Sequence, residues 1–217
     1  MAEFPNPVRE VVAERGIGNA RGHLNEGQQL LYDAIYAAAE ETRPQLVLPI
    51  TNYTGYDIER ALFSILNDCP ELFWLDFSDC TYVLDNSETT INLNYLYSGE
   101  TLESMRGQLS SAVDEIVDAT NAQNLSNEYE KAVYVHDYIT AICEYDRSQQ
   151  AGDIHNAYGA LGARLAVCDG YAHAYQLVLQ QLGIECHYVP GRAESLDGVE
   201  GHAWNIAKLD GVYTHID

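Results

Sequence analysis

The chain has 217 residues, 47% of them hydrophobic, and its 33 acidic against 11 basic residues give a formal net charge of −22. This charge argues against nucleic acid and anionic membrane surfaces as partners, and no apolar stretch is long enough to span a bilayer, so we expect no membrane segment in this chain. The acidic residues fit a solubilising surface, and they are also compatible with a cationic or amine-bearing partner.

The first residues, MAEFPNPVREVVAERG, contain no apolar core of a signal peptide. The opening FPNP is typical of an excised boundary, and the chain stops where a strand is expected to continue past Asp217. We therefore expect a piece of a longer protein, truncated at its C-terminus. The compartment stays open, and an exported or cell-surface full-length protein is one possibility.

The N-terminal half alternates between helical and strand patterns. We predict a helix over 24–41 and a strand over 45–50, followed by a second helix with Asp57 as its N-cap. The segment CPELFWLD is apolar and aromatic, which favours a loop packed on the core. The residues after it, CTYVLDNSETTINLNYLY, alternate around an Asp-Asn-Ser turn and predict a β-hairpin.

The C-terminal half begins with helical patterns over 101–120 and 127–146. A further helix carries CDGYAHAYQLVLQQ and ends at Gly183, which is a typical C-cap. A strand over 184–193 and a final hairpin follow, and the hairpin's turn LDGV carries the Asp-Gly signal. This order predicts an α+β fold, with an N-terminal α/β region over 1–122 and a second domain over 123–217.

The five cysteines stand at positions 69, 80, 143, 168 and 186, and no two of them form a CxxC pair. A zinc ribbon is therefore not expected, and the cysteines and histidines near the C-terminus lack the spacing of metal-ligand pairs. Disulfides Cys69–Cys80 or Cys143–Cys186 are conceivable in an exported protein, and the odd count leaves at least one thiol unpaired within the chain.

A cysteine at the start of a helix raises a chemical question. The unpaired N–H groups and the dipole of a helix N-terminus favour thiolate over thiol, so we expect Cys168 to be a reactive nucleophile. His202 and Asp217 stand on the two strands of the final hairpin, where pairing brings them close if both face the same way. Nucleophile, base and orienting carboxylate are the parts of cysteine-dependent acyl transfer, and the Cys168 N–H is a natural oxyanion donor.

The residues from about 129 to 217 resemble the transglutaminase-like domains of bacteria. The matching pieces, in order, are YVHDYI, NAYGAL, AVCDGYAHAY, LGIECHYVPG and GHAWNIAKLDGVYTHID. The resemblance implies a papain-like α+β core in which a helix bearing the cysteine packs on an antiparallel sheet. It also implies a triad of Cys168, His202 and Asp217, with no cofactor and no metal.

The resemblance implies acyl transfer on peptide or amide bonds through a thioester. We expect a peptidase or amidase, because no feature of the sequence builds a tunnel for a lysine acceptor. A protein cross-linking transglutaminase and an inactive binding module of the same fold are the alternatives. The expected partners are a protein or peptide substrate and, for the cross-linker, an amine donor. Tyr158, Trp204 and His155 flank the motifs and are candidate substrate contacts. One departure from the family is that Arg164 and Leu165 replace a Gly-Lys-like turn.

Overall fold

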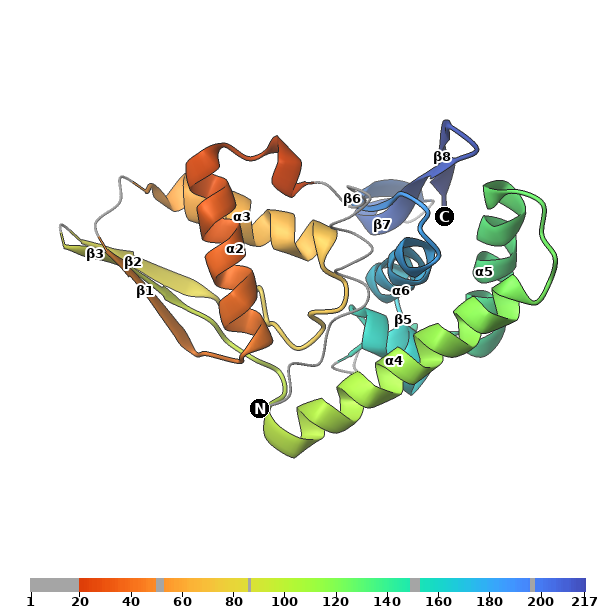
Figure 1. Cartoon of the computed structure of the whole chain (residues 1–217), viewed down its shortest axis with the longest axis horizontal. Coiled ribbons are helices and arrows are strands. Elements are labelled where there is room, and N and C mark those ends of the chain that lie inside the picture. Colours follow the sequence, from red (N-terminus) through yellow and green to blue (C-terminus); the bar gives the residue numbers. More distant parts are fainter. Residues whose placement is uncertain (1–19, 50–52, 86, 149–152, 196–197) are drawn as a thin grey trace. The chain divides into compact units, whose positions relative to one another are not determined.

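The computed structural model describes residues 20–49, 53–85, 87–148, 153–195 and 198–217. They form two units, one within residues 19–103 and one of residues 104–217, shown in Figure 1. Each unit is described by itself below. The division predicted from sequence, into residues 1–122 and 123–217, stays a prediction.

The unit within residues 19–103 combines two helices with a three-stranded sheet. Its elements are the 3-10 turn η1 (Arg21–His23), α2 (Glu26–Glu40), β1 (Gln45–Pro49), α3 (Gly55–Asp68), β2 (Thr81–Leu84) and β3 (Glu88–Asn92), followed by the first turn of α4 (Gly99–Asn121). The sheet is antiparallel in the order β1-β3-β2, which confirms the predicted hairpin. Residue 86 of the predicted turn lies outside the described residues.

Both helices of this unit begin at a capping box. The N-cap of α2 is Asn25, whose side chain accepts the backbone N–H of Gln28 at 2.9 Å. The prediction of Asp57 as the N-cap of α3 is wrong, because Thr54 holds that position and Asp57 is the third helical residue. The Asp57 carboxylate instead accepts the backbone N–H of Thr54 at 2.9 Å, which is the other half of the same capping box.

The aromatic loop predicted to pack on the core does so. Its residues Leu72, Phe73, Trp74 and Leu75 are all buried. The indole N–H of Trp74 donates to the backbone carbonyl oxygen of Ala39 at 2.9 Å, which satisfies its polar group inside the core.

The unit of residues 104–217 contains the candidate catalytic residues. Its elements are the rest of α4, α5 (Glu128–Ile142), β4 (Glu144–Tyr145), the π-helical turn η2 (Gly159–Ala163), β5 (Leu165–Ala166), α6 (Cys168–Gln181), β6 (Cys186–Ser195), β7 (Gly198–Leu209) and β8 (Val212–Ile216). The strands β6, β7 and β8 form an antiparallel sheet in that order. Helix α6 packs against β6 and β7, and α5 packs against α6 (Figure 1). The architecture is the predicted α+β core.

Helix α6 begins at Cys168, as predicted. Val167 is its N-cap residue, and at the other end Gly183 takes a φ of +77°, which glycine adopts without strain. The predicted helix over 127–146 is too long, because α5 ends at Ile142 and the chain then forms the strand β4. That strand pairs in parallel with β5, so the residues just before Cys168 are held by hydrogen bonds to a distant segment.

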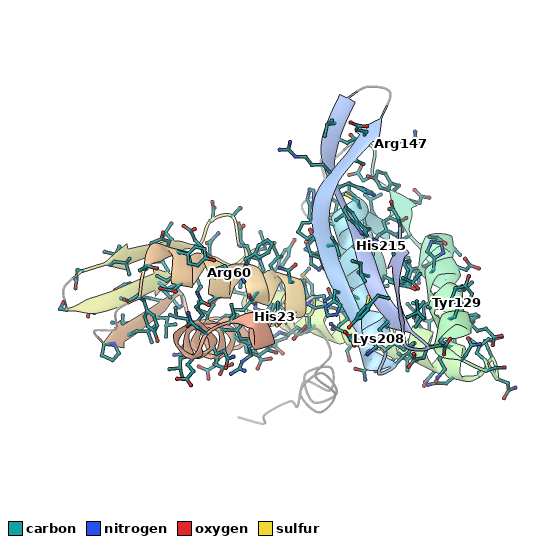
Figure 2. The ribbon with its side chains drawn as sticks, turned by 90° about the horizontal axis from the view of Figure 1, so that it is seen from above. His23, Arg60, Tyr129, Arg147, Lys208 and His215 are labelled. Atoms are coloured by element: carbon teal, nitrogen blue, oxygen red, sulfur yellow. The ribbon has the colours of Figure 1, made fainter. Side chains whose placement is uncertain are left out.

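The β7–β8 turn closes on Asp210 and Gly211, with φ of +51° and +86°. Two successive residues with positive φ match the predicted Asp-Gly hairpin turn. The Asp210 carboxylate also accepts the backbone N–H groups of Glu128 and Tyr129, at 3.1 and 3.3 Å, which are unpaired donors at the start of α5. Figure 2 shows Tyr129 at this end of the helix and His215 on β8. The turn therefore ties the hairpin to α5.

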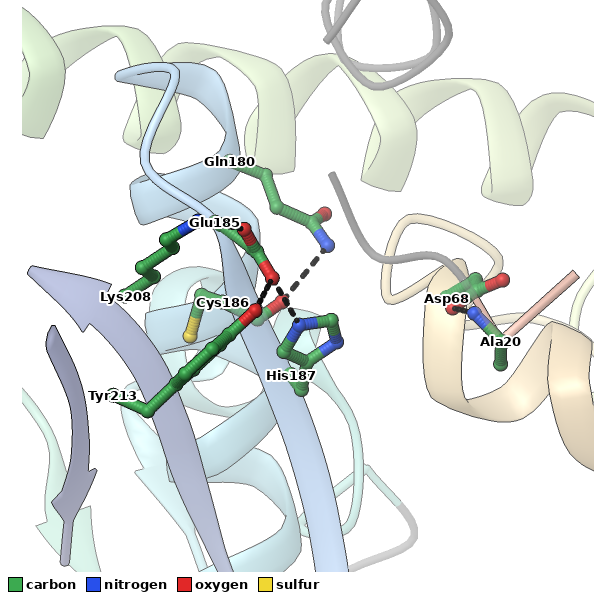
Figure 3. A network of polar contacts seen from close by, with 8 residues as sticks. All are labelled: Ala20, Asp68, Gln180, Glu185, Cys186, His187, Lys208 and Tyr213. Carbon is green, nitrogen blue, oxygen red and sulfur yellow. Dashed lines mark hydrogen bonds and ion pairs between the residues drawn. The ribbon is translucent and has the colours of Figure 1, made fainter. Parts of the chain in front are cut away.

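Glu185, between α6 and β6, ties that junction to the C-terminal hairpin (Figure 3). Its carboxylate accepts the hydroxyl of Tyr213 on β8 at 2.7 Å and lies 3.1 Å from His187 Nε2 on β6. The ammonium of Lys208 on β7 lies 3.9 Å from the same carboxylate. Glu185 therefore contacts all three strands of the sheet just after the C-terminal end of α6, the end opposite Cys168.

Candidate active site

Cys168 is the first residue of α6, and its sulfur faces β7. The backbone N–H groups of Ala203 and Asp169 and the Tyr145 hydroxyl lie near enough to the thiol to act on its pKa. The side chain also packs against Ala172, Tyr188 and Ala203. Ala203 directly follows His202 in the sequence, and Cys168 and His202 line the same cleft.

The expectation that the helix N-terminus keeps Cys168 as a thiolate is wrong, because the pKa of this thiol is raised. Burial raises the pKa of this thiol, and the neighbouring Asp169 carboxylate raises it further. The N–H groups of Ala203 and Asp169 and the Tyr145 hydroxyl act in the opposite direction but do not outweigh these effects. Cys168 is therefore a neutral thiol at neutral pH and needs a base to activate it.

His202 and Asp217 are in direct contact. The imidazole Nε2 lies 2.8 Å and 2.9 Å from the two carboxylate oxygens of Asp217. The β7–β8 register, in which Asn205 faces Ile216, makes Asp217 the next position, across from Trp204 and diagonal to His202. With Nε2–H donated to the carboxylate, Nδ1 is the ring nitrogen left to accept a proton.

These three residues line one cleft of about 300 Å³. The other lining residues come from α5, β4, α6, β7 and β8: His136, Ile139, Thr140, Tyr145, Tyr171, Ala172, Tyr175, Ala203, Trp204, Asn205 and Ile216. Asn205 is buried and bonded, since its amide donates to the carbonyl oxygen of Ala172 at 3.0 Å. This bond fixes β7 against α6 beside the nucleophile.

Trp204, a predicted substrate contact, lies in this cleft. Its ring stacks near that of His202, with centroids 5.9 Å apart, and its indole N–H donates to His215 Nδ1 at 3.0 Å. A Cβ atom on Gly191 would come within 2.4 Å of the indole, so the edge of the ring lies directly against that glycine of β6. The side chain is therefore held in one orientation beside the imidazole.

The other two predicted substrate contacts lie elsewhere among the described residues. The Tyr158 hydroxyl donates to the side chain of Gln108 at 2.9 Å. His155 is largely exposed, and its Nδ1 lies 2.8 Å from the Asp169 carboxylate. Neither is among the described residues that line the cleft, and a substrate role for them stays a prediction.

Tyr145 is a cleft residue that sequence reasoning missed. It ends β4, and it lies close enough to Cys168 that each side chain affects the pKa of the other. Burial raises the pKa of Tyr145, and so does the nearby thiol. The available signal was weak, because a tyrosine 23 positions before the cysteine only becomes its neighbour through the pairing of β4 with β5.

The Asp169 carboxylate is bonded to two side chains other than Cys168. Its carboxylate accepts the Tyr188 hydroxyl at 2.8 Å and contacts His155. Behind Tyr188 lies the buried His173, whose ring stacks on the tyrosine with centroids 4.2 Å apart. This polar layer sits under the first turn of α6 and fixes the side chain that follows the nucleophile.

In the described part of the chain, no group of three or more histidine, cysteine or acidic side chains is arranged to hold a metal ion. All five cysteines are free thiols. No helix in the described ranges is long and apolar enough to cross a membrane.

Three of the solved structures that are similar to this chain are described here. A proposed cysteine protease from Cytophaga hutchinsonii is 16% identical over 64% of this chain and 61% of its own, with a TM-score of 0.41. A TGase is 12% identical over 80% of this chain and 50% of its own, with a TM-score of 0.45. A proposed protease from Parabacteroides distasonis is 12% identical over 66% of this chain and 35% of its own, with a TM-score of 0.37.

This chain therefore spans between about a third and three fifths of the length of those proteins. No curated protein matches the chain in sequence. The sequence model of the transglutaminase-like superfamily matches residues 117–217, a segment that contains Cys168, His202 and Asp217. Residues 117–217 are therefore a domain of the transglutaminase-like superfamily.

Proposed function

We propose that this protein hydrolyses peptide or amide bonds through a thioester on Cys168. The observation that carries the proposal is the contact of both Asp217 oxygens with His202 Nε2, in the same cleft as the thiol. A carboxylate in this position fixes the imidazole tautomer and stabilises its charged form. The neutral thiol then has a base prepared to take its proton.

The proposed reaction has two halves. In the first, the Cys168 proton passes to His202 Nδ1 while Sγ attacks the acyl carbon. The carbon–nitrogen bond then breaks as the imidazolium protonates the leaving amine. In the second, His202 takes a proton from water, the hydroxide oxygen attacks the thioester, and the carboxylic acid leaves as Sγ regains a proton.

The residue roles in this proposal are those expected from sequence: Cys168 as nucleophile, His202 as base and Asp217 as orienting carboxylate. Trp204 supports them, because an indole fixed at both ends limits the motion of the neighbouring imidazole. The aromatic lining favours an extended peptide or amide with apolar groups over a compact charged substrate.

A peptide library mixed with a labelled primary amine tests the proposal. After incubation with the protein, mass spectrometry should find new peptide termini, and Cys168→Ala should abolish them. Covalent addition of the amine, dependent on Cys168, would instead make the protein a transamidating enzyme. Identical spectra for the wild type and Cys168→Ala would mean that the cleft binds without catalysing.

A further inference from the structure

His215 on β8 holds the indole ring of Trp204 on the neighbouring strand. The register partner of His215 is Ile206, two residues after Trp204, so the two rings are diagonal neighbours. The indole N–H donates to His215 Nδ1 at 3.0 Å, and the opposite edge of the ring lies against Gly191. Trp204 is therefore anchored by a backbone surface on one side and by a single hydrogen bond on the other.

This hydrogen bond exists only while Nδ1 of His215 carries no proton. An indole N–H donates and never accepts, so the ring nitrogen facing it must be the acceptor of a neutral imidazole. Once both imidazole nitrogens are protonated, two N–H groups face each other and the bond is lost. Histidine is the side chain that takes up this extra proton between about pH 5 and 8. His215 is exposed, so water can supply the proton.

The Trp204 ring in turn borders the imidazole of the candidate base. Its centroid lies 5.9 Å from that of His202, with the two planes 29° apart. The Asp217 carboxylate holds the same imidazole at one atom, Nε2. A contact at one atom leaves the ring free to tilt, and a fixed neighbouring ring limits that tilt.

We infer that His215 is a positioning residue of this site, which holds Trp204 beside His202 only while its own imidazole is neutral. This inference rests on the proposed function. His215 is not among the described residues that line the cleft, so it acts through the indole and not on the substrate. As the pH falls, the site should therefore lose the fixed position of its indole as well as the neutral form of its base.

Other titratable groups share this face of the sheet. By strand register they are His187 on β6, His202 and Lys208 on β7, and Tyr213 and Asp217 on β8. The carboxylate among them, Asp217, is bonded to His202. A protonated His215 two positions along the same strand would compete for that carboxylate. This attraction acts in the same direction as the loss of the indole bond.

Two substitutions of His215 separate the hydrogen bond from the titration. His215→Asn places a side-chain oxygen acceptor where Nδ1 lies, and this amide does not titrate. His215→Leu removes the acceptor at every pH. His187→Asn is the matched control, because it removes an imidazole of the same sheet that contacts Glu185 instead of the indole.

Acylation of Cys168 by p-nitrophenyl acetate, corrected for a Cys168→Ala blank, measures the site without a known substrate. At pH 8 we expect His215→Asn to match the wild type and His215→Leu to be about tenfold slower, because one anchoring hydrogen bond is lost. At pH 5 the wild type should fall to the rate of His215→Leu, while His215→Asn stays about tenfold faster. His187→Asn should follow the wild type at both pH values.

Two further measurements test whether His215 acts through Trp204. In a Trp204→Phe background, His215→Leu should cause no additional loss, because the indole is absent. The chain has two tryptophans, and the indole N–H of the other, Trp74, donates to a backbone carbonyl in the core. In a nitrogen-15 NMR spectrum, the Trp204 indole signal should therefore shift more between pH 8 and 5 in the wild type than in His215→Asn.

Three results would overturn the inference. The same pH dependence in the wild type and His215→Asn would show that protonation of His215 does not matter. Full acylation by His215→Leu at pH 8 would show that the indole needs no such anchor. An equal loss from His215→Leu with and without Trp204 would assign the effect to another contact. If Cys168→Ala instead releases p-nitrophenol as fast as the wild type, the proposed function itself fails, and the positioning role fails with it.

Discussion

Gly170 lies directly against the backbone carbonyl oxygen of Ile154. A Cβ atom at this position would come within 2.5 Å of that oxygen and 2.8 Å of the Ala166 side chain. The same oxygen accepts the backbone N–H of Val167, the N-cap residue of α6, at 2.9 Å. The Ile154 carbonyl group therefore helps to fix the start of α6. It also limits how closely α6 can pack at Gly170, two residues after Cys168.

Gly170→Ala should destabilise the protein, although alanine is the better helix former. A β-carbon pressed against a backbone carbonyl has no side chain to push aside, so the first turn of α6 must shift. Gly107→Ala, on α4 with nothing within 4 Å of its Cβ, is the matched control. We expect that control to raise the free energy of unfolding by up to about 1 kcal/mol. Urea unfolding of both variants tests the pair, and a stabilised Gly170→Ala would contradict the packing argument.

Asp217→Asn should reduce turnover by roughly 10³-fold or more, because an amide no longer stabilises the imidazolium or selects its tautomer. The thermal midpoint should change little, since the Asp217 side chain is 67% exposed. Asp137→Asn provides a control in a second exposed pair, in which the carboxylate lies 3.1 Å from His136. Steady-state kinetics on any substrate found in the library experiment give the answer. Equal turnover in wild type and Asp217→Asn would remove Asp217 from the mechanism.

The alkylation rate of Cys168 should keep increasing with pH beyond the usual range of a cysteine thiol. The reason is that burial and the Asp169 carboxylate raise its pKa, and only the thiolate reacts. Asp169→Asn removes the carboxylate charge and should shift the pH dependence of the alkylation rate to lower pH. Iodoacetamide labelling with peptide mapping measures both. A plateau below pH 7 in the wild type would instead reveal a preformed thiolate–imidazolium pair with His202.

The stability of the protein should fall as the pH drops below about 6.5, partly through His173. Burial lowers the pKa of His173 to about 4, so between these values the unfolded chain binds a proton that the folded chain does not. The stabilisation is complete above pH 6.5 and is lost progressively as the pH falls towards 4, with a total of about 3 kcal/mol.

His173→Phe keeps an aromatic ring against Tyr188 and removes the titrating group. Denaturant unfolding at a series of pH values should therefore give a shallower dependence for this variant than for the wild type. Parallel curves between pH 4 and 6.5 would show that His173 does not titrate differently in the folded and unfolded chains.

Local features of this protein could be predicted from sequence because their causes lie within a few residues. The start of α6 at Cys168, its end at Gly183 and the Asp210-Gly211 turn each depend on adjacent backbone geometry. The error in the N-cap of α3 is also local. Thr54 and Asp57 belong to one capping box, and the sequence pattern alone does not show which of them is the N-cap. The two-residue strands β4 and β5 were missed because they are too short for alternation to be visible.

The candidate site could be predicted only in part from the sequence. The motif order placed Cys168, His202 and Asp217 in one hypothesis, and hairpin register made contact between the last two a reasonable expectation. The pairing of β4 with β5 decided that Tyr145 meets the thiol, and packing decided that Trp204 rather than Tyr158 lines the cleft. The raised pKa of Cys168 likewise depends on burial, which is a sum over neighbours from separate segments. Sequence determines the local geometry around each residue, whereas solvent exclusion and the meeting of distant side chains exist only once the chain has folded.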